Sequence, residues 1–302
     1  MKKTLASLLV PLSLCATDYV FVDLDHPWEV DRKYPWHFEV DGRAVATADF
    51  EDLKGSKLHY KDAHAFGYYS RFWNEKNAFS LQLGYTYMQL DWDKSARGIE
   101  QNHFHLGLAS LAFISNALDR WRFIVNLGMT VDTTTFDFGH SSVYYTLLWG
   151  RYSFLKNVGV HAGFFGFTGV HTTYFLPVLG FDFQINPKWR LNAIFPLDFS
   201  LSYNFDPSWE AALSWATFGG PYRYPWRVNG GHGQFRDAVI EVYANGLELD
   251  LNYNYRRNFF AGIGAGWNFG GWILVRDHNG HHGKYYDFNT APYIQANLAI
   301  TF

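Results

Sequence analysis

The chain has 302 residues, a formal net charge of −3 at pH 7 and a mean hydropathy of −0.18. That charge excludes the basic face typical of nucleic-acid binding, and beyond the first 16 residues no apolar run approaches the roughly 20 residues of a membrane helix. Aromatic residues make up 20% of the chain, far more than an aliphatic core requires. Since Trp and Tyr suit the membrane interface, the composition favours a membrane protein, which without helices must be a closed β-barrel.

Residues 1–16 are predicted to be a signal peptide. Lys2 and Lys3 precede a short apolar stretch, and small residues at 13–16 offer a cleavage zone. Cys15 is the only cysteine. A lipoprotein would have a small residue directly before its lipidated cysteine, whereas this chain has Leu14 there. We therefore expect an exported mature chain without disulfides. Its first part, 17–36, is predicted to be a periplasmic lead-in, and 37–302 an outer-membrane β-barrel.

The rest of the chain alternates between apolar and polar residues with the period of two that is typical of strands. In the stretch 78–92, for example, Phe79 and Leu81 flank Ser80. The predicted strands are 37–50, 57–73, 78–92, 103–115, 121–136, 143–153, 158–168, 174–185, 189–195, 198–205, 209–218, 239–256, 259–276 and 286–302. The pattern predicts an all-β fold, a transmembrane antiparallel up-and-down β-barrel of 12–14 strands. The number depends on whether the short hairpin 189–205 spans the membrane, since spanning strands need about nine to eleven residues.

The connections between these strands alternate in length. The short ones are 74–77, 116–120, 155–157, 186–188, 206–208 and 257–258, and the long ones include 51–56, 93–101, 219–237 and 277–284. Outer-membrane barrels have short periplasmic turns and long outer loops, so both barrel termini are expected on the periplasmic side. Trp121, Trp189 and Trp209 each follow a short turn and are predicted to form an aromatic belt there. Aromatic plugs at the open end of a soluble barrel are the less favoured alternative.

Two local features complete the predicted barrel. The apolar face of 239–256 changes parity at Asn245 and Gly246, which predicts a β-bulge. The last stretch, P-Y-I-Q-A-N-L-A-I-T-F, alternates as a strand that pairs with 37–50 and closes the barrel. Its Leu298, Ile300 and Phe302 resemble the terminal signal that the barrel-assembly machinery reads in outer-membrane barrels.

Faces opposite the apolar ones are predicted to line the lumen. The candidate lumen residues are Glu39, Asp41, Arg43, Arg71, Arg122, Asp132, Glu248 and Asp250. Charges of both signs predict a hydrated or salt-bridged interior, which fits an open pore as well as a closed polar network. Gly262, Gly264, Gly266 and Gly270 share the inner parity of 259–276, where they either relieve crowding or bend the strand.

Two histidine groups are candidate chemical sites. His278, His281 and His282 have a spacing that could hold a metal, but no carboxylate or cysteine stands at a matching spacing. His103 and His105 could face inward as part of a hydrolase, yet no Ser or Asp motif accompanies them. We therefore expect no enzyme, no metal site and no cofactor.

The C-terminal part carries a family resemblance. The segments that carry it are L-P-V-L-G-F-D-F-Q-I-N-P-K-W-R-L-N-A-I-F-P at 176–196, L-S-Y-N-F-D-P-S-W-E at 201–210 and G-G-P-Y-R-Y at 219–224. Over 174–302 the chain resembles an uncharacterised family, a domain of unknown function, of predicted bacterial outer-membrane β-barrels. The resemblance implies a barrel and an outer-membrane location, with no known substrate or catalytic residues.

The functional hypothesis is a passive outer-membrane channel for small polar solutes. The alternative is a closed structural or surface-contact barrel that acts through its outer loops, above all 219–237. The expected partners are outer-membrane lipid, the barrel-assembly machinery and small polar solutes, and no nucleic acid.

Overall fold

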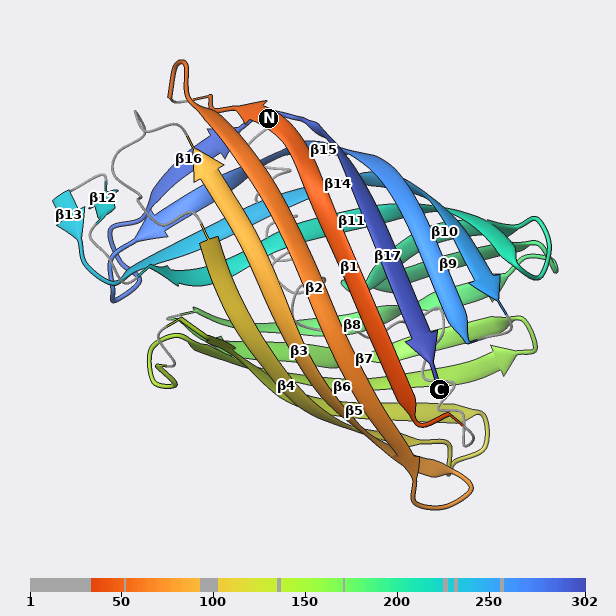
Figure 1. Ribbon diagram of the computed structural model, residues 1–302. Helices are drawn as coiled ribbons and strands as arrows, with labels where there is room; N and C mark the ends of the chain where they lie inside the picture. Colours follow the sequence, from red (N-terminus) through yellow and green to blue (C-terminus); the bar gives the residue numbers. More distant parts are fainter. Residues whose placement is uncertain are drawn as a thin grey trace.

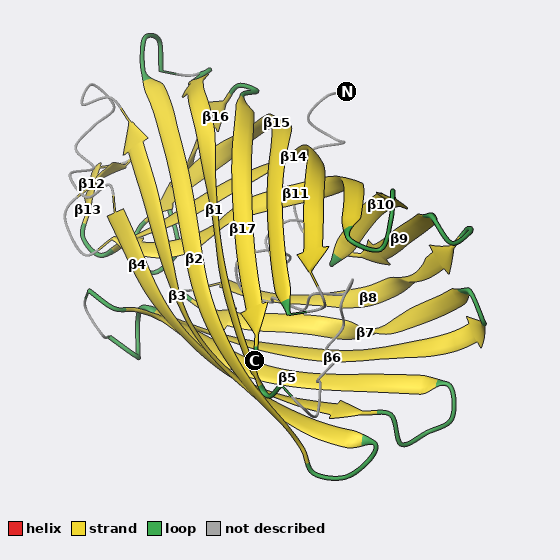
Figure 2. Cartoon of the chain, turned by 45° about the vertical axis from the view of Figure 1, so that its right-hand side comes forward, coloured by secondary structure: helices red, strands yellow, loops and turns green. Residues whose placement is uncertain are grey.

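The computed structural model describes residues 34–51, 53–92, 103–134, 137–170, 172–224, 228–230, 233–255 and 258–302. Within these residues the regular structure consists of strands (Figures 1 and 2). They are β1 (Trp36–Asp49), β2 (Lys57–Phe72), β3 (Asn77–Trp92), β4 (His103–Ser115), β5 (Trp121–Asp132), β6 (Ser142–Leu155), β7 (Val158–Gly169), β8 (Thr172–Gln184), β9 (Trp189–Phe195), β10 (Asp198–Asn204), β11 (Trp209–Tyr224), β12 (Val228–Gly230), β13 (Gly233–Phe235), β14 (Ala238–Tyr255), β15 (Phe259–Arg276), β16 (Lys284–Phe288) and β17 (Pro292–Thr301). In these ranges no helix has the length and apolar character to cross a membrane. The predicted signal peptide and most of the predicted lead-in lie outside the described residues.

The main sheet closes on itself as an antiparallel barrel. Each of β1 to β11 pairs with its neighbour in sequence, β11 pairs with β14, β14 with β15, β15 with β17, and β17 with β1. The barrel therefore has 14 strands, the upper end of the predicted range. The seven-residue strands β9 and β10 are full members of the wall despite their length. The register from His37↔Thr301 to Val45↔Tyr293 confirms that the C-terminal strand closes the barrel.

Several predicted elements differ from those observed. The strand predicted as 121–136 ends at Asp132, and the predicted loop 219–237 contains β12 and β13. The strand predicted to end at Phe218 continues to Tyr224. The strand predicted as 286–302 is interrupted at 289–291, and its two parts, β16 and β17, both pair with β15. At the interruption the side chain of Asn268 takes the place of a ladder partner, because its Oδ1 accepts the backbone N–H of Ala291 at 3.0 Å.

The register between β14 and β15 shifts at the predicted place, from Ala244↔Gly271 to Gly246↔Asn268, but the extra residue belongs to β15. Since β14 pairs with β11 without a shift, the predicted bulge in β14 is wrong, and Ile240 and Val242 face the interior. A second shift, which the sequence did not reveal, falls between Val45 and Ala48 in β1. Because of this shift the side chain of Ala48 points into the interior.

The two ends of the barrel differ in their connections. At one end short turns join the strands, and Asn74, Asn186 and Asp206 each accept two backbone N–H bonds inside their turn, which is how Asx side chains stabilise tight turns. We call this the short-turn end and the opposite one the long-loop end. The backbones of Trp36 and Phe302 bond to each other at the short-turn end, through N···O distances of 3.0 and 2.9 Å.

The outer face of the wall is apolar. Val40, Leu249 and Ile263 leave 54%, 61% and 65% of their surface exposed, and Trp189 and Trp209 are exposed beside the short turns. A closed barrel that turns aliphatic side chains outward fits lipid better than water. The outer surface therefore supports a barrel that spans a membrane.

Candidate functional site

The inner face carries most of the predicted lumen residues. Glu39, Asp41, Arg43, Arg122, Asp132, Glu248 and Asp250 share the inner parity of their strands. Arg71 does not, because it is exposed and pairs with Phe79, whose ring lies on the outer face. The prediction that Arg71 lines the lumen is wrong. Tyr60 and Phe66 make the inner face of β2 as apolar as its outer face, so hydropathy alone could not orient that strand.

Residues of β1 and β2 form one charged part of the lumen. Arg43 Nη1 lies 3.8 Å from Asp62 Oδ2. His64 Nε2 lies 3.8 Å from Asp62 Oδ1 and 4.0 Å from Asp41 Oδ1. The Arg43 guanidinium also lies over the Phe218 ring, 4.8 Å from its centroid. The sequence did not indicate Asp62 and His64, because both faces of β2 carry apolar residues and only its register with β1 shows which face lines the lumen.

Glu248 and Asp250 on β14 extend this group, which we call the acidic wall: Asp41, Asp62, Glu248 and Asp250, with Arg43 among them. Gln295 Nε2 donates to Asp250 Oδ1 at 2.6 Å, and Ser214 Oγ donates to Asp250 Oδ2 at 3.3 Å. A Cβ on Gly264 would collide with the Asp250 carboxylate and with Gln295. Gly262, Gly264 and Gly266 therefore make room for large neighbours, whereas Gly270, with a φ of +89°, lies where the register of β15 shifts and fits the bending role.

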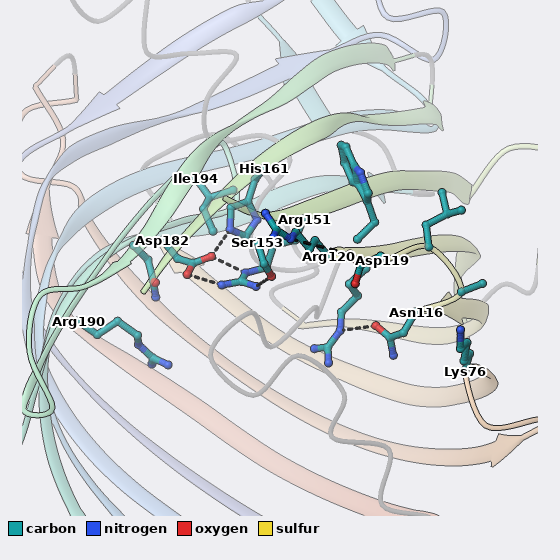
Figure 3. Close-up of a pocket in the computed structure, with 15 residues that line it drawn as sticks. Lys76, Asn116, Asp119, Arg120, Arg151, Ser153, His161, Asp182, Arg190 and Ile194 are labelled. Atoms are coloured by element: carbon teal, nitrogen blue, oxygen red, sulfur yellow. Dashed lines mark hydrogen bonds and ion pairs between the residues drawn. The ribbon is translucent and has the colours of Figure 1, made fainter. Parts of the chain in front are cut away.

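A cavity of about 680 Å³ opens at the short-turn end on the other side of the lumen (Figure 3). We call it the basic pocket. Its charged lining residues are Lys76, Arg120, Arg122, Arg151, Arg190, Asp119 and Asp182, and Asn116, Ser153, His161 and Asn192 are among its polar ones. Five basic against two acidic side chains give the described lining a formal excess of three positive charges.

One ion pair organises the wall of this pocket. Arg151 donates from Nε and Nη2 to the two carboxylate oxygens of Asp182, at 2.6 and 2.7 Å. The Trp149 indole N–H donates to His161 Nδ1 at 3.1 Å, and His161 Nε2 lies 2.6 Å from Asp182 Oδ1. Because an indole can only donate, Nδ1 is the acceptor and the proton on Nε2 points at Asp182. The Asp182 carboxylate is thereby held by two partners.

Removing that carboxylate should destabilise the barrel. Asp182→Ala leaves Arg151 and His161 without their shared acceptor, and we expect the free energy of unfolding to fall by about 2–3 kcal/mol. The loss is smaller than for a fully buried pair, because the Arg151 and Asp182 side chains are 30% and 18% exposed. Denaturant titration of the refolded protein measures this. Asp119→Ala, at a side chain that is 98% exposed, is the matched control, and equal stability of the two variants would contradict a structural role for Asp182.

The long-loop half of the lumen is packed with apolar side chains. We call this packing the apolar layer. Its large members are Phe50, Leu58, Tyr60, Met88, Leu90, Trp92, Phe104, Leu106, Phe218, Tyr222, Tyr224, Ile240, Val242, Ile273, Val275, Tyr286, Phe288 and Tyr293. The prediction of a hydrated or salt-bridged interior is therefore wrong for the long-loop half and only partly right for the short-turn half, where a second apolar cluster that includes Ile114, Ile124 and Trp149 lies beside the charged residues. Along β3 the inner face is polar at Gln82 and apolar at Met88, Leu90 and Trp92. The face that lines the lumen was predicted correctly for this strand, but its polarity changes along the strand.

The apolar layer joins opposite sides of the barrel. Phe104 on β4 and Tyr222 on β11 have ring centroids 5.1 Å apart, although these strands are seven positions apart in either direction around the barrel. The Tyr60 and Phe218 rings, on β2 and β11, are 5.5 Å apart. Contacts of this kind leave no water-filled passage between those strands.

The candidate histidines lie outside the basic pocket and the acidic wall. His103 and His105 face outward, where His103 Nδ1 bonds the Tyr87 hydroxyl at 2.7 Å and His105 bonds Tyr85, so the geometry of a lumen hydrolase is not met. In the long loop after β15, His282 Nδ1 lies 2.9 Å from Asp277.

That loop carboxylate serves as a turn cap. Desolvation acts to raise its pKa, but the His282 ring and the backbone N–H groups of His281 and Asn279 hold the pKa of Asp277 below its usual range. Among the residues that the structure describes, no three potential metal ligands of the His, Cys, Asp and Glu types come together.

Comparison with known proteins gives distant relatives. No family model matches the chain, so the domain-of-unknown-function family stays a resemblance. An uncharacterised protein of Chlamydia pneumoniae is 20% identical over 282 residues, which cover 89% of this chain and 87% of that protein. An uncharacterised protein of Chlamydia trachomatis is 22% identical over 280 residues, covering 88% and 86%.

Solved structures with a similar fold are outer-membrane proteins. An outer membrane channel from Pseudomonas putida F1 has a TM-score of 0.47 at 7% identity, covering 89% of this chain and 96% of that one. The TodX monoaromatic hydrocarbon channel deltaS2 mutant has a TM-score of 0.46 at 10% identity, covering 89% and 91%. Both likenesses are distant.

Proposed function

We propose that the protein is an integral outer-membrane channel for small polar solutes, and that the apolar layer shuts it in the conformation described. The observation that carries this proposal is the 5.1 Å ring contact between Phe104 and Tyr222 across the barrel. By the usual orientation of such barrels the short-turn end faces the periplasm and the long-loop end faces outside. The basic pocket then opens to the periplasm, and solutes cross only when the layer rearranges.

The distribution of polarity along the lumen supports a gate. The short-turn half holds Arg122, Arg151 and Glu248 beside a smaller apolar cluster, whereas the large inner side chains of the long-loop half, such as Phe104, Leu90 and Tyr222, are mainly apolar. Apolar constrictions close pores by excluding water, so a modest displacement of rings can switch conduction on. A uniformly packed core would have no reason to keep a cavity of about 680 Å³ at one end.

A closed barrel that meets partners through its loops is the second candidate. The same apolar layer favours it, because a permanently packed lumen needs no gate.

Single-channel recording of the refolded protein in planar bilayers separates the two candidates. We expect long closed periods interrupted by discrete openings. A complete absence of openings at every voltage that the bilayer tolerates would reject the channel and favour the closed barrel.

A further inference from the structure

We propose that the acidic wall contains a binding site for a cationic group of the guanidinium or ammonium type, which Arg43 occupies in the conformation described and for which a cationic solute can compete. We call it the cation site, and its members are Asp62, Glu248 and Asp250 with the rings of Phe218 and Tyr293. The inference rests on the proposed channel and deepens it by naming a class of solute.

The cation site offers two aromatic faces to a positive charge. The guanidinium carbon of Arg43 lies 4.8 Å from the Phe218 ring centroid and 5.5 Å from the Tyr293 centroid. The two rings are themselves 5.5 Å apart, at an interplanar angle of 66°. A ring face within about 6 Å attracts a cation, more strongly where water is excluded. Two faces on one guanidinium therefore make this position favourable for a cation.

Three carboxylates surround the same guanidinium. Arg43 Nη1 lies 3.8 Å from Asp62 Oδ2, and Glu248 and Asp250 on β14 are close enough to interact with Arg43 electrostatically. The other charged neighbour of Asp62 is His64, whose Nε2 lies 3.8 Å from Asp62 Oδ1. Even a protonated His64 would give the three carboxylates only two positive charges. The cation site therefore has acceptors for more than its own arginine.

Two buried carboxylate oxygens in the cation site accept no hydrogen bond. Glu248 is 5% exposed, and its Oε2 has no hydrogen-bond partner among the described residues. The same holds for Asp62 Oδ2, in a side chain that is 3% exposed. Buried carboxylate oxygens are normally hydrogen-bonded. A guanidinium or ammonium group donates the bonds that these two oxygens lack.

Arg43 occupies the cation site without forming all the hydrogen bonds that it offers. Its Nε has no hydrogen-bond partner within the described part of the chain. The 3.8 Å between Arg43 Nη1 and Asp62 Oδ2 is longer than the roughly 2.7–3.2 Å of an N–H···O bond. A free solute is not tethered to β1 and can approach the same oxygens more closely. A cationic solute can therefore compete with Arg43.

The inner face of β1 leads to the cation site from the short-turn end. Glu39 and Asp41 precede Arg43 on that face at every second position, and the exposed fraction of the side chain falls from 25% at Glu39 to 22% at Asp41 and 13% at Arg43. A cation that enters from this end is attracted along β1. Because Phe218 and Tyr293 also belong to the apolar layer, displacing Arg43 changes the contacts of the layer itself.

Binding to the refolded barrel in detergent tests the proposal, with ethylguanidinium as the probe and N-ethylurea as its uncharged analogue. NMR titration measures the dissociation constants. The wild type should bind ethylguanidinium weakly, because the probe must displace Arg43, and should not bind ethylurea. Arg43→Ala empties the cation site and should bind ethylguanidinium about tenfold more tightly or better, and adding Glu248→Gln should weaken that binding by about tenfold.

Two matched controls remove the same chemical groups elsewhere. Arg71→Ala removes an exposed arginine from the outer face and should leave ethylguanidinium binding as in the wild type. Glu75→Gln changes an exposed carboxylate in the turn after β2. Combined with Arg43→Ala, it should leave the tight binding unchanged.

Three results would overturn the proposal. They are a wild type that does not bind ethylguanidinium, equal binding of the two probes, and an Arg43→Ala barrel that binds no more tightly than the wild type. Gel mobility with and without heating shows that each variant is folded. If Arg43→Ala does not fold, ethylguanidinium but not ethylurea should restore its refolding, and failure of that rescue would also contradict the proposal. Because binding is measured without current, the cation site can be present in a barrel that never conducts, and a conducting barrel can lack it.

Discussion

Replacing Phe104 and Tyr222 together by alanine is expected to convert a mostly closed barrel into one that conducts steadily. The two rings meet across the lumen at 5.1 Å, and no other contact between strands seven positions apart is as direct among the described ring pairs. Their removal leaves a gap that water can enter, since the neighbouring acidic wall supplies polar partners. Planar-bilayer recording should show current that persists at low voltage, where the wild type is closed.

A matched control separates the gate from general loss of packing. Phe79 and Phe113 are neighbours on the outer face of β3 and β4, with ring centroids 5.7 Å apart. Replacing both by alanine removes the same aromatic groups without touching the lumen. If the Phe104 and Tyr222 double variant conducts no better than this control, the layer is not a gate and the closed-barrel function is preferred.

Deleting Phe302 is expected to leave most of the protein unassembled. Its backbone exchanges two hydrogen bonds with Trp36, and its ring stacks on Phe38 at 5.7 Å. The deletion therefore removes the last rung between the strands that close the barrel. Leu298 and Ile300 expose 55% and 47% of their surface on the same outer face, where a terminal signal would have to be read.

The readout is the fraction of protein whose gel mobility changes on heating. Phe302→Tyr keeps the ring and the chain length and should assemble normally. Phe259→Ala removes an exposed aromatic residue from the short-turn end of the neighbouring β15 and should have a small effect. A Phe302 deletion that assembles as well as the Phe259 variant would show that the terminal residue carries no assembly information.

Most of the fold could be predicted because most strands are long and the turns between them are distinct. The alternation in β3 and the asymmetry of the connections predicted the barrel and its closing pair. The apparent parity change at Gly246 was misleading, because the extra residue lies in β15 and β14 continues without a break. The interruption at 289–291 was not predictable, since the side chain of Asn268, distant in sequence, creates it.

The site was less predictable, because the inner face changes character along the lumen. In β6 both faces are apolar, with Leu147 and Trp149 inside and Leu148 outside. The sequence therefore did not show that Arg151 faces the lumen. Arg71 was assigned to the wrong face for the same reason. Asp62 and His64 stand between aromatic residues on a strand whose orientation only the register with β1 reveals. Which side chains meet across a barrel depends on the number of strands and on the shape of the closed barrel. The alternation of apolar and polar residues along a strand gives neither.

Photo-crosslinking from position 104 tests the central claim most directly. With Phe104 replaced by p-benzoyl-phenylalanine, which keeps an aromatic side chain at this position, irradiation of the refolded protein in lipid should link position 104 to the β11 peptide that contains Tyr222. The same photoreactive residue at Phe113, on the outer face of β4, should link only to neighbouring strands or lipid. Mass spectrometry that finds position 104 linked only to β3 or β5, with no β11 product, would contradict a lumen closed by the apolar layer.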